Sequence, residues 1–157
     1  MHRPVAVANK LMEIAAREGM DSSFTPMQLL KLVYLCHAWM LGLYGRPMLN
    51  ESVEAWRYGP VVRSLYDAIS HYKDKPVQYP IRQPLFGKSE SFSAEEESII
   101  RQVNEQYGYL DGITLSRMTH TPGSPWYVTW HSQGPNSVIS NDLIEHFYRA
   151  KYTDAEA

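Results

Sequence analysis

The chain has 157 residues, of which 44% are hydrophobic and 20% are charged, and its formal net charge is −2 at pH 7. This length suits one domain with a sizeable core, and the charge balance lacks the basic excess of a protein that binds nucleic acid directly. The single cysteine, the absence of a signal-peptide core and the absence of about 20 consecutive apolar residues all argue for a cytoplasmic protein without membrane contact.

Two helices are predicted in the N-terminal third. The first spans residues 4–18, where apolar residues recur at helical spacing. The second opens with a capping box formed by Thr25 and Gln28 and runs to about Tyr44. This helix is apolar on nearly every face, interrupted mainly by Gln28, Lys31 and His37. Such a helix belongs at the centre of a bundle.

The segment that follows mixes extended and helical signals. Residues 51–58 form a short mixed stretch that we expect to be extended. Gly59-Pro60 then predicts the start of a helix, because proline is favoured in the first turn. Residues 73–91 contain three prolines and a glycine, which predict an irregular connection with a short extended pair near residues 77–79.

The C-terminal half is again helical. A second capping box, formed by Ser93 and Glu96, opens a helix that runs to about residue 107. Shorter helices are expected at residues 115–120 and after Pro125, and Ser140 caps a last helix that ends near residue 151. The elements together predict a mainly α fold: a compact single-domain helical bundle over residues 1–157, built around a buried central helix, with at most a small β element.

The sequence motifs give no positive case for an enzyme. Gly87-Lys88-Ser89 resembles the end of a phosphate-binding loop, but Arg82 stands where that motif needs its first glycine. Cys36 shares a helix face with apolar residues, which indicates a core residue rather than a nucleophile. The six histidines have no zinc-ligand spacing. We therefore expect no catalytic residue, no metal site and no cofactor.

Three segments resemble the SocA-like Panacea domain family, which is found in antitoxins and in phage-associated proteins. The first is Leu-Leu-Lys-Leu-Val-Tyr-Leu at residues 29–35, with Gly-Arg-Pro at residues 45–47. The second and most specific is Glu-Ala-Trp-Arg-Tyr-Gly-Pro-Val-Val at residues 54–62, continuing to Leu-Tyr at residues 65–66. The third is Leu-Ser-Arg-Met-Thr-His at residues 115–120, followed closely by Pro125-Trp126.

Five residues of these segments have an architectural interpretation, in which they form the hub where helices meet. They are Trp56, Gly59, Pro60, His120 and Trp126. In an extended run Trp56 and Tyr58 would share one face, because they are two residues apart. In the alternative interpretation the same region forms a recognition groove, to which Arg57, Tyr58 and His120 contribute polar contacts.

The resemblance implies an antitoxin that binds a cognate toxin directly and blocks it, or an adaptor that hands the toxin to a protease. Aromatic and arginine side chains carry most of the binding energy in protein interfaces. The candidate partner-binding residues are therefore Arg57, Tyr58, Arg63 and Tyr66. The sequence identifies neither the toxin nor the oligomeric state.

Two alternatives remain open from the sequence. One is a small-molecule or nucleotide-processing enzyme with a site around Trp56, Tyr58 and His120, which would require a shared polar pocket and measurable turnover. The other is a phage-encoded protein that binds a host target, which would use the same binding physics with a different partner.

Overall fold

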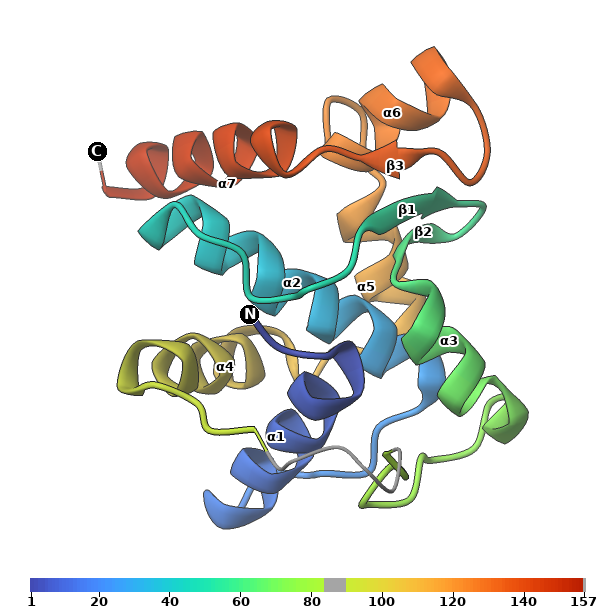
Figure 1. Cartoon of the computed structure of the whole chain (residues 1–157), viewed down its shortest axis with the longest axis vertical. Helices are drawn as coiled ribbons and strands as arrows, with labels where there is room; N and C mark the ends of the chain where they lie inside the picture. The colour runs from blue at the N-terminus through green and yellow to red at the C-terminus, as the bar shows by residue number, and fades with distance from the viewer. Residues whose placement is uncertain (84–89, 157) are drawn as a thin grey trace.

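The computed structural model describes residues 1–83 and 90–156, and its fold is mainly α. The long helix α2 (Pro26–Tyr44) crosses the middle of the molecule (Figure 1), in contact with five other helices. These are α1 (Pro4–Arg17), α3 (Arg63–Ile69), α4 (Ala94–Tyr107), α5 (Gly112–Thr119) and α7 (Asn141–Glu156). The helical bundle around a buried central helix is therefore confirmed.

Local sequence signals set the ends of α2. Thr25 Oγ1 accepts a hydrogen bond from the backbone N–H of Gln28, and Gln28 Oε1 accepts one from the N–H of Thr25 at 2.8 Å. These bonds satisfy donors that have no partner inside the first helical turn. Gly45 ends the helix in the left-handed region, with φ of 70°. The predicted capping box, and the matching one between Ser93 and Glu96 at α4, are both confirmed.

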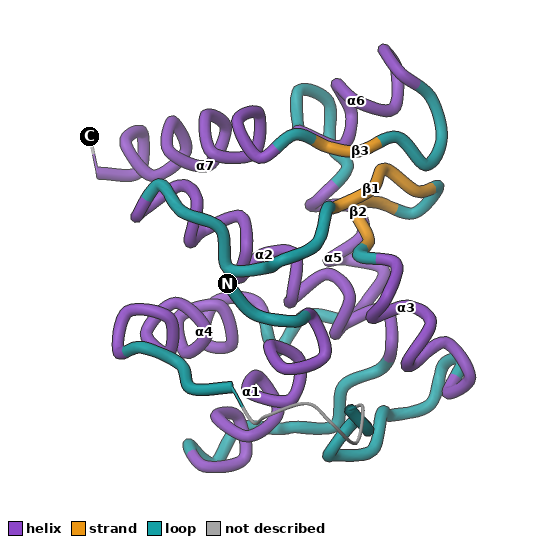
Figure 2. The backbone as a smooth tube through the Cα atoms, in the orientation of Figure 1, coloured by secondary structure: helices purple, strands orange, loops and turns teal. Residues whose placement is uncertain are grey.

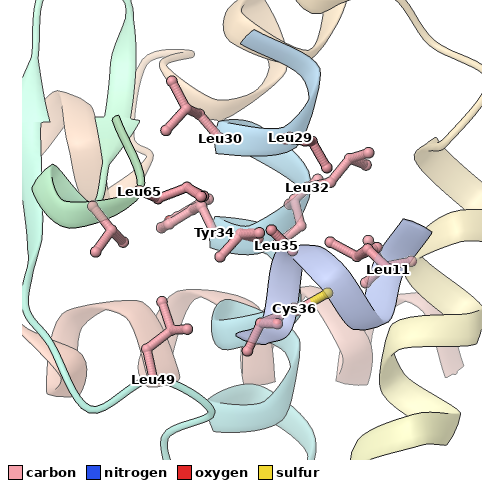
Figure 3. Packing of buried hydrophobic residues seen from close by; sticks show 14 of the residues in the cluster. Leu11, Leu29, Leu30, Leu32, Tyr34, Leu35, Cys36, Leu49 and Leu65 are labelled. Atoms are coloured by element: carbon pink, nitrogen blue, oxygen red, sulfur yellow. The ribbon is translucent and has the colours of Figure 1, made fainter. Parts of the chain in front are cut away.

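The core gathers on all sides of α2. Leu32, Leu35 and Cys36 of this helix lie close to Leu11 of α1 (Figure 3). Cys36 is fully buried, and this burial raises the pKa of its thiol far above the ordinary value. The cysteine is therefore a small core residue, as its position on the apolar face predicts.

His37 joins three segments inside this core. Its Nδ1 accepts the backbone N–H of Leu49 at 3.1 Å, and its Nε2 lies 2.9 Å from Oδ1 of Asn141. These partners require a neutral imidazole with the proton on Nε2. Burial accordingly lowers the pKa of His37, although the bond to Asn141 acts in the opposite direction. The ring thereby ties α2 to the loop before the sheet and to the start of α7.

A small antiparallel sheet lies beside α6 (Pro125–Gln133), as Figure 2 shows. Strands β1 (Val53–Trp56) and β2 (Gly59–Val61) form a hairpin, and β3 (Val138–Ile139) pairs with the other edge of β1. The strand order is β2-β1-β3. Trp56 pairs with Gly59 across the hairpin turn, where Gly59 has φ of 116°, a conformation that favours glycine.

The predicted helix start at Gly59-Pro60 is wrong. Pro60 lies in β2 opposite Ala55, and the helix begins only at Arg63. Proline fits there because β2 is an edge strand, where a missing N–H breaks no ladder bond. A proline after a glycine thus marks a hairpin here rather than a first helical turn.

Three smaller predictions also differ from the structure. Residues 77–79 form no strand pair, although the N–H of Val77 donates to the carbonyl of Phe24. Helix α5 begins at Gly112 rather than at residue 115, because the carboxylate of Asp111 caps it by accepting the N–H of Thr114. Helix α7 continues past residue 151 to Glu156.

A short 3₁₀ helix, η1 (Ser70–Tyr72), extends α3. The predicted irregular connection over residues 73–91 has no helix or strand in its described part, and the Gly87-Lys88-Ser89 triplet lies outside the described residues. Within the described ranges, no helix is both long and apolar enough to cross a membrane.

Candidate partner-binding groove

A groove of about 450 Å³ opens at the N-terminal end of α2. One wall comes from the first two turns of α2, the second from the β1–β2 hairpin, and the third from α3 and η1. Its main lining side chains are Met27, Leu30, Lys31, Trp56, Arg57, Tyr58, Tyr66 and Lys73. Elements far apart in the sequence therefore meet at one concave surface.

The aromatic wall of the groove is held by a network on the hairpin. The rings of Trp56 and Tyr66 meet edge to face, with centroids 4.9 Å apart. Trp56 Nε1 donates to Glu54 Oε1 at 3.0 Å, and Arg63 lies over the indole at 5.1 Å while it pairs with the same carboxylate. Burial opposes ionisation of Glu54, but the bonds from Trp56 and Arg63 outweigh it and hold its pKa below the ordinary value.

The rim of the groove carries two accessible tyrosines. Tyr58 is 57% exposed at the hairpin turn, and Tyr66 is 40% exposed on α3. The guanidinium of Arg57 lies 5.4 Å from the centre of the Tyr58 ring. Exposed tyrosines beside an arginine are the residue types that dominate protein interfaces.

Behind the groove, the hairpin is fixed to α5 and α6. Trp126 Nε1 donates to the carbonyl of Trp56 at 2.6 Å, and the hydroxyl of Ser116 donates to the carbonyl of Tyr58. The ring of His120 packs against Trp126 with centroids 5.1 Å apart. Packing is also close at Gly59, where a Cβ would lie 3.1 Å from Thr119 Oγ1 and would require this side chain to shift slightly. The groove is consequently built on a rigid support.

Lys31 lies at the floor of the groove and is only 2% exposed. Its Nζ donates to the carbonyl of Pro60 at 3.1 Å, so that it links α2 to β2. Burial lowers the pKa of this amine from 10.5 to about 7.

Within the described ranges, no group of His, Cys, Asp and Glu side chains is arranged to hold a metal ion.

The sequence model of the family described as "Antitoxin SocA-like, Panacea domain" matches residues 29–127, which is more than half of the chain. The chain belongs to this family. "Antitoxin SocA" of Caulobacter vibrioides (strain NA1000 / CB15N) is 30% identical over 153 residues, an alignment that covers 94% of this chain and 80% of the relative. No solved structure matches the chain. Membership of the SocA-like family indicates an antitoxin role and a non-enzymatic activity.

The SocA-like match contains most of the groove. It extends from α2 through the hairpin, α3, α4 and α5 to the first turn of α6. Of the candidate binding residues, Arg57, Tyr58 and Tyr66 line the groove, whereas Arg63 stands behind Trp56 and pairs with Glu54. The region matched by the family model thus includes most of the residues that form this surface.

Within the part of the chain that the structure describes, the three residues proposed for an enzyme site do not all line the groove. Trp56 and Tyr58 line the groove, whereas His120 packs on Trp126 and its Nδ1 lies 3.5 Å from the hydroxyl of Ser116. Contacts between different elements involve Trp56, Gly59, Pro60, His120 and Trp126. The hub interpretation of these residues stays a prediction.

Sequence reasoning missed Lys31, Met27 and Leu30 as groove residues. The sequence did contain a signal that Lys31 is unusual. Between Pro26 and Tyr44 it is the single residue of the charged types Asp, Glu, Lys and Arg. A lone charge in an apolar helix requires a compensating contact. The identity of that contact depends on β2, whose position relative to α2 the sequence did not show.

Proposed function

We propose that this protein is an antitoxin that neutralises a cognate toxin in the cytoplasm by stoichiometric association, with the groove as its contact surface. The observation that carries this proposal is the placement of Tyr58 and Tyr66, both exposed, on either side of a concave surface inside the family-matched region. These residues offer large aromatic contact areas that a partner can cover.

The support behind the groove favours association at low entropic cost. Hydrogen bonds to the carbonyls of Trp56 and Tyr58 fix the hairpin before a partner arrives. The Glu54–Arg63 pair holds the indole of Trp56 from the other side. A surface that is already ordered loses less conformational freedom on binding, which increases affinity.

The proposal is tested by co-expressing the tagged chain with the protein encoded by the adjacent gene. We expect that the second protein arrests growth alone, that growth resumes when this chain is present, and that the two are recovered in equimolar amounts. Growth that is arrested equally with and without the chain, or recovery of the chain alone, would overturn the proposal.

The same strains distinguish a blocking antitoxin from a protease adaptor. After protein synthesis is stopped, the amount of toxin is followed over time with and without the chain. A blocking antitoxin leaves a stable, inactive complex, whereas an adaptor shortens the lifetime of the toxin and depends on a functional protease.

A further inference from the structure

Within the described residues, Lys31 has hydrogen-bonding capacity that is not used. Its ammonium carries three N–H donors, and the carbonyl of Pro60 is its hydrogen-bond partner among residues 1–83 and 90–156. Buried donors in folded proteins are nearly always paired. Lys31 is only 2% exposed yet lines the groove, so the groove is the side from which an acceptor would approach its amine.

The groove offers this lysine no negative charge. Among the residues that the structure describes, its lining includes Lys31, Arg57 and Lys73 and no Asp or Glu. The nearby carboxylate of Glu54 is already paired with Arg63 and with the indole N–H of Trp56. The lowered pKa of Lys31 has burial as its cause, with no neighbouring carboxylate to offset it. The groove is therefore an apolar surface with an excess of positive charge.

We propose that the groove receives an Asp or Glu side chain of the bound toxin, whose carboxylate pairs with Lys31. The inference rests on the proposed function of the groove, and it adds the chemistry of the occupant. The carboxylate supplies acceptors for the remaining N–H groups of Lys31, while an apolar neighbour in the toxin packs on Leu30 and Tyr66.

This pairing would make the groove selective. A toxin with Asn, Gln or an apolar residue at the same position would cover Lys31 and leave a buried amine without a charged partner. Discrimination of this kind depends on the penalty for the wrong partner as much as on the contact with the right one.

Proton uptake on binding tests the pairing directly. At pH 8 most free antitoxin has a neutral Lys31, because its pKa is about 7. An entering carboxylate favours the charged form and raises the pKa, so that binding takes up a proton from the buffer. Calorimetric titration of purified antitoxin with the co-purified toxin, in two buffers of different ionisation enthalpy, counts that proton.

We expect uptake of close to one proton per complex at pH 8 for the wild type and for Lys151→Met, which removes an exposed lysine of α7. For Lys31→Met we expect no uptake and an affinity about tenfold or more lower, since truncation of a buried interfacial charge weakens binding by at least this factor. Substitution of each toxin Asp and Glu by Asn or Gln should identify one position that abolishes uptake.

Association without proton uptake, with Lys31→Met binding as tightly as the wild type, would overturn the inference and leave the proposed function intact. Absence of any association would overturn both. Proton uptake on addition of N-acetylglutamate alone would assign the site to a small carboxylate. Proton uptake on self-association of the antitoxin would assign it to a second copy of the chain. Either result would contradict the pairing with the toxin.

Discussion

At the scale of single residues, the buried Lys31 and His37 of α2 have different surroundings. His37 uses both ring nitrogens, one toward Leu49 and the other toward Asn141. Lys31 has the carbonyl of Pro60 and a groove above it. Both nitrogens of His37 thus have hydrogen-bond partners, whereas Lys31 has one partner among the described residues of the free protein. Such a residue favours binding at the expense of the stability of the unbound chain.

We therefore predict that Lys31→Met stabilises the free protein below pH 7. The pKa of Lys31 is about 7 in the folded state and 10.5 in the unfolded state, so between these values the unfolded chain binds more protons. The free energy of unfolding of the wild type then rises from pH 7 to pH 10.5 through this group. At pH 6 the variant should be more stable by about 1–4 kcal/mol, as for other buried charges replaced by apolar residues.

Urea unfolding followed by circular dichroism at pH 6, 8 and 10 measures this difference. The gap between Lys31→Met and the wild type should narrow as the pH rises, and Lys151→Met should show no comparable gain. A variant that is less stable than the wild type at pH 6 would show that Lys31 stabilises the fold and would remove the argument for an incompletely paired amine.

At the scale of elements, the capping boxes correctly predicted the starts of two helices, whereas the helix start predicted from Gly59-Pro60 was wrong. Thr25 with Gln28 and Ser93 with Glu96 act locally, so the sequence contains all the groups that form each capping box. Gly59-Pro60 is locally compatible with a helix start and with a hairpin. The pairing with β1 and the hydrogen bond from Lys31 decide between them, and both involve residues distant in sequence.

The contact between α2 and α7 includes a glycine, Gly42. A Cβ placed on Gly42 of α2 would lie 2.8 Å from Cβ of Tyr148 on α7, and 3.0 Å from the carbonyl carbon of the same residue. At this glycine, α7 lies too close to α2 to admit a Cβ without a shift, and Arg149 Nε donates to the carbonyl of Gly42 at 3.2 Å.

We predict that Gly42→Ala destabilises the protein by about 1–3 kcal/mol, the usual effect of overpacking. Intrinsic helix propensity alone would give a gain of about 1 kcal/mol for the same change. The matched control is Glu105→Ala at an exposed position of α4, where we expect a change within about 0.5 kcal/mol. Chemical unfolding that finds Gly42→Ala as stable as the wild type would show that α7 can move away freely.

At the scale of the whole molecule, the fold class followed from the sequence, but the groove did not. An apolar helix bounded by capping signals is sufficient to predict a bundle with α2 at its centre. The groove needs the hairpin to sit against the first turns of α2, with α3 closing the third side. That arrangement depends on contacts of Trp126 and Ser116 with the hairpin backbone, which side-chain patterns do not reveal.

The two ends of α2 consequently have different roles. Its C-terminal half packs against α7 and carries Gly42, while its first turns form a wall of the groove. This separation provides a matched control for substitutions in the groove. Tyr152 on α7 is 44% exposed, close to the 40% exposure of Tyr66 in the groove.

The most direct test of the account is the dissociation constant of the toxin complex for Tyr58→Ala, Tyr66→Ala and Tyr152→Ala, with folding checked by circular dichroism. We expect the two groove variants to bind at least about thirtyfold more weakly, the effect of losing a hot spot of about 2 kcal/mol, and Tyr152→Ala to bind like the wild type. Unchanged binding by both groove variants, with weakened binding by Tyr152→Ala, would place the toxin at the other end of α2 and contradict the account.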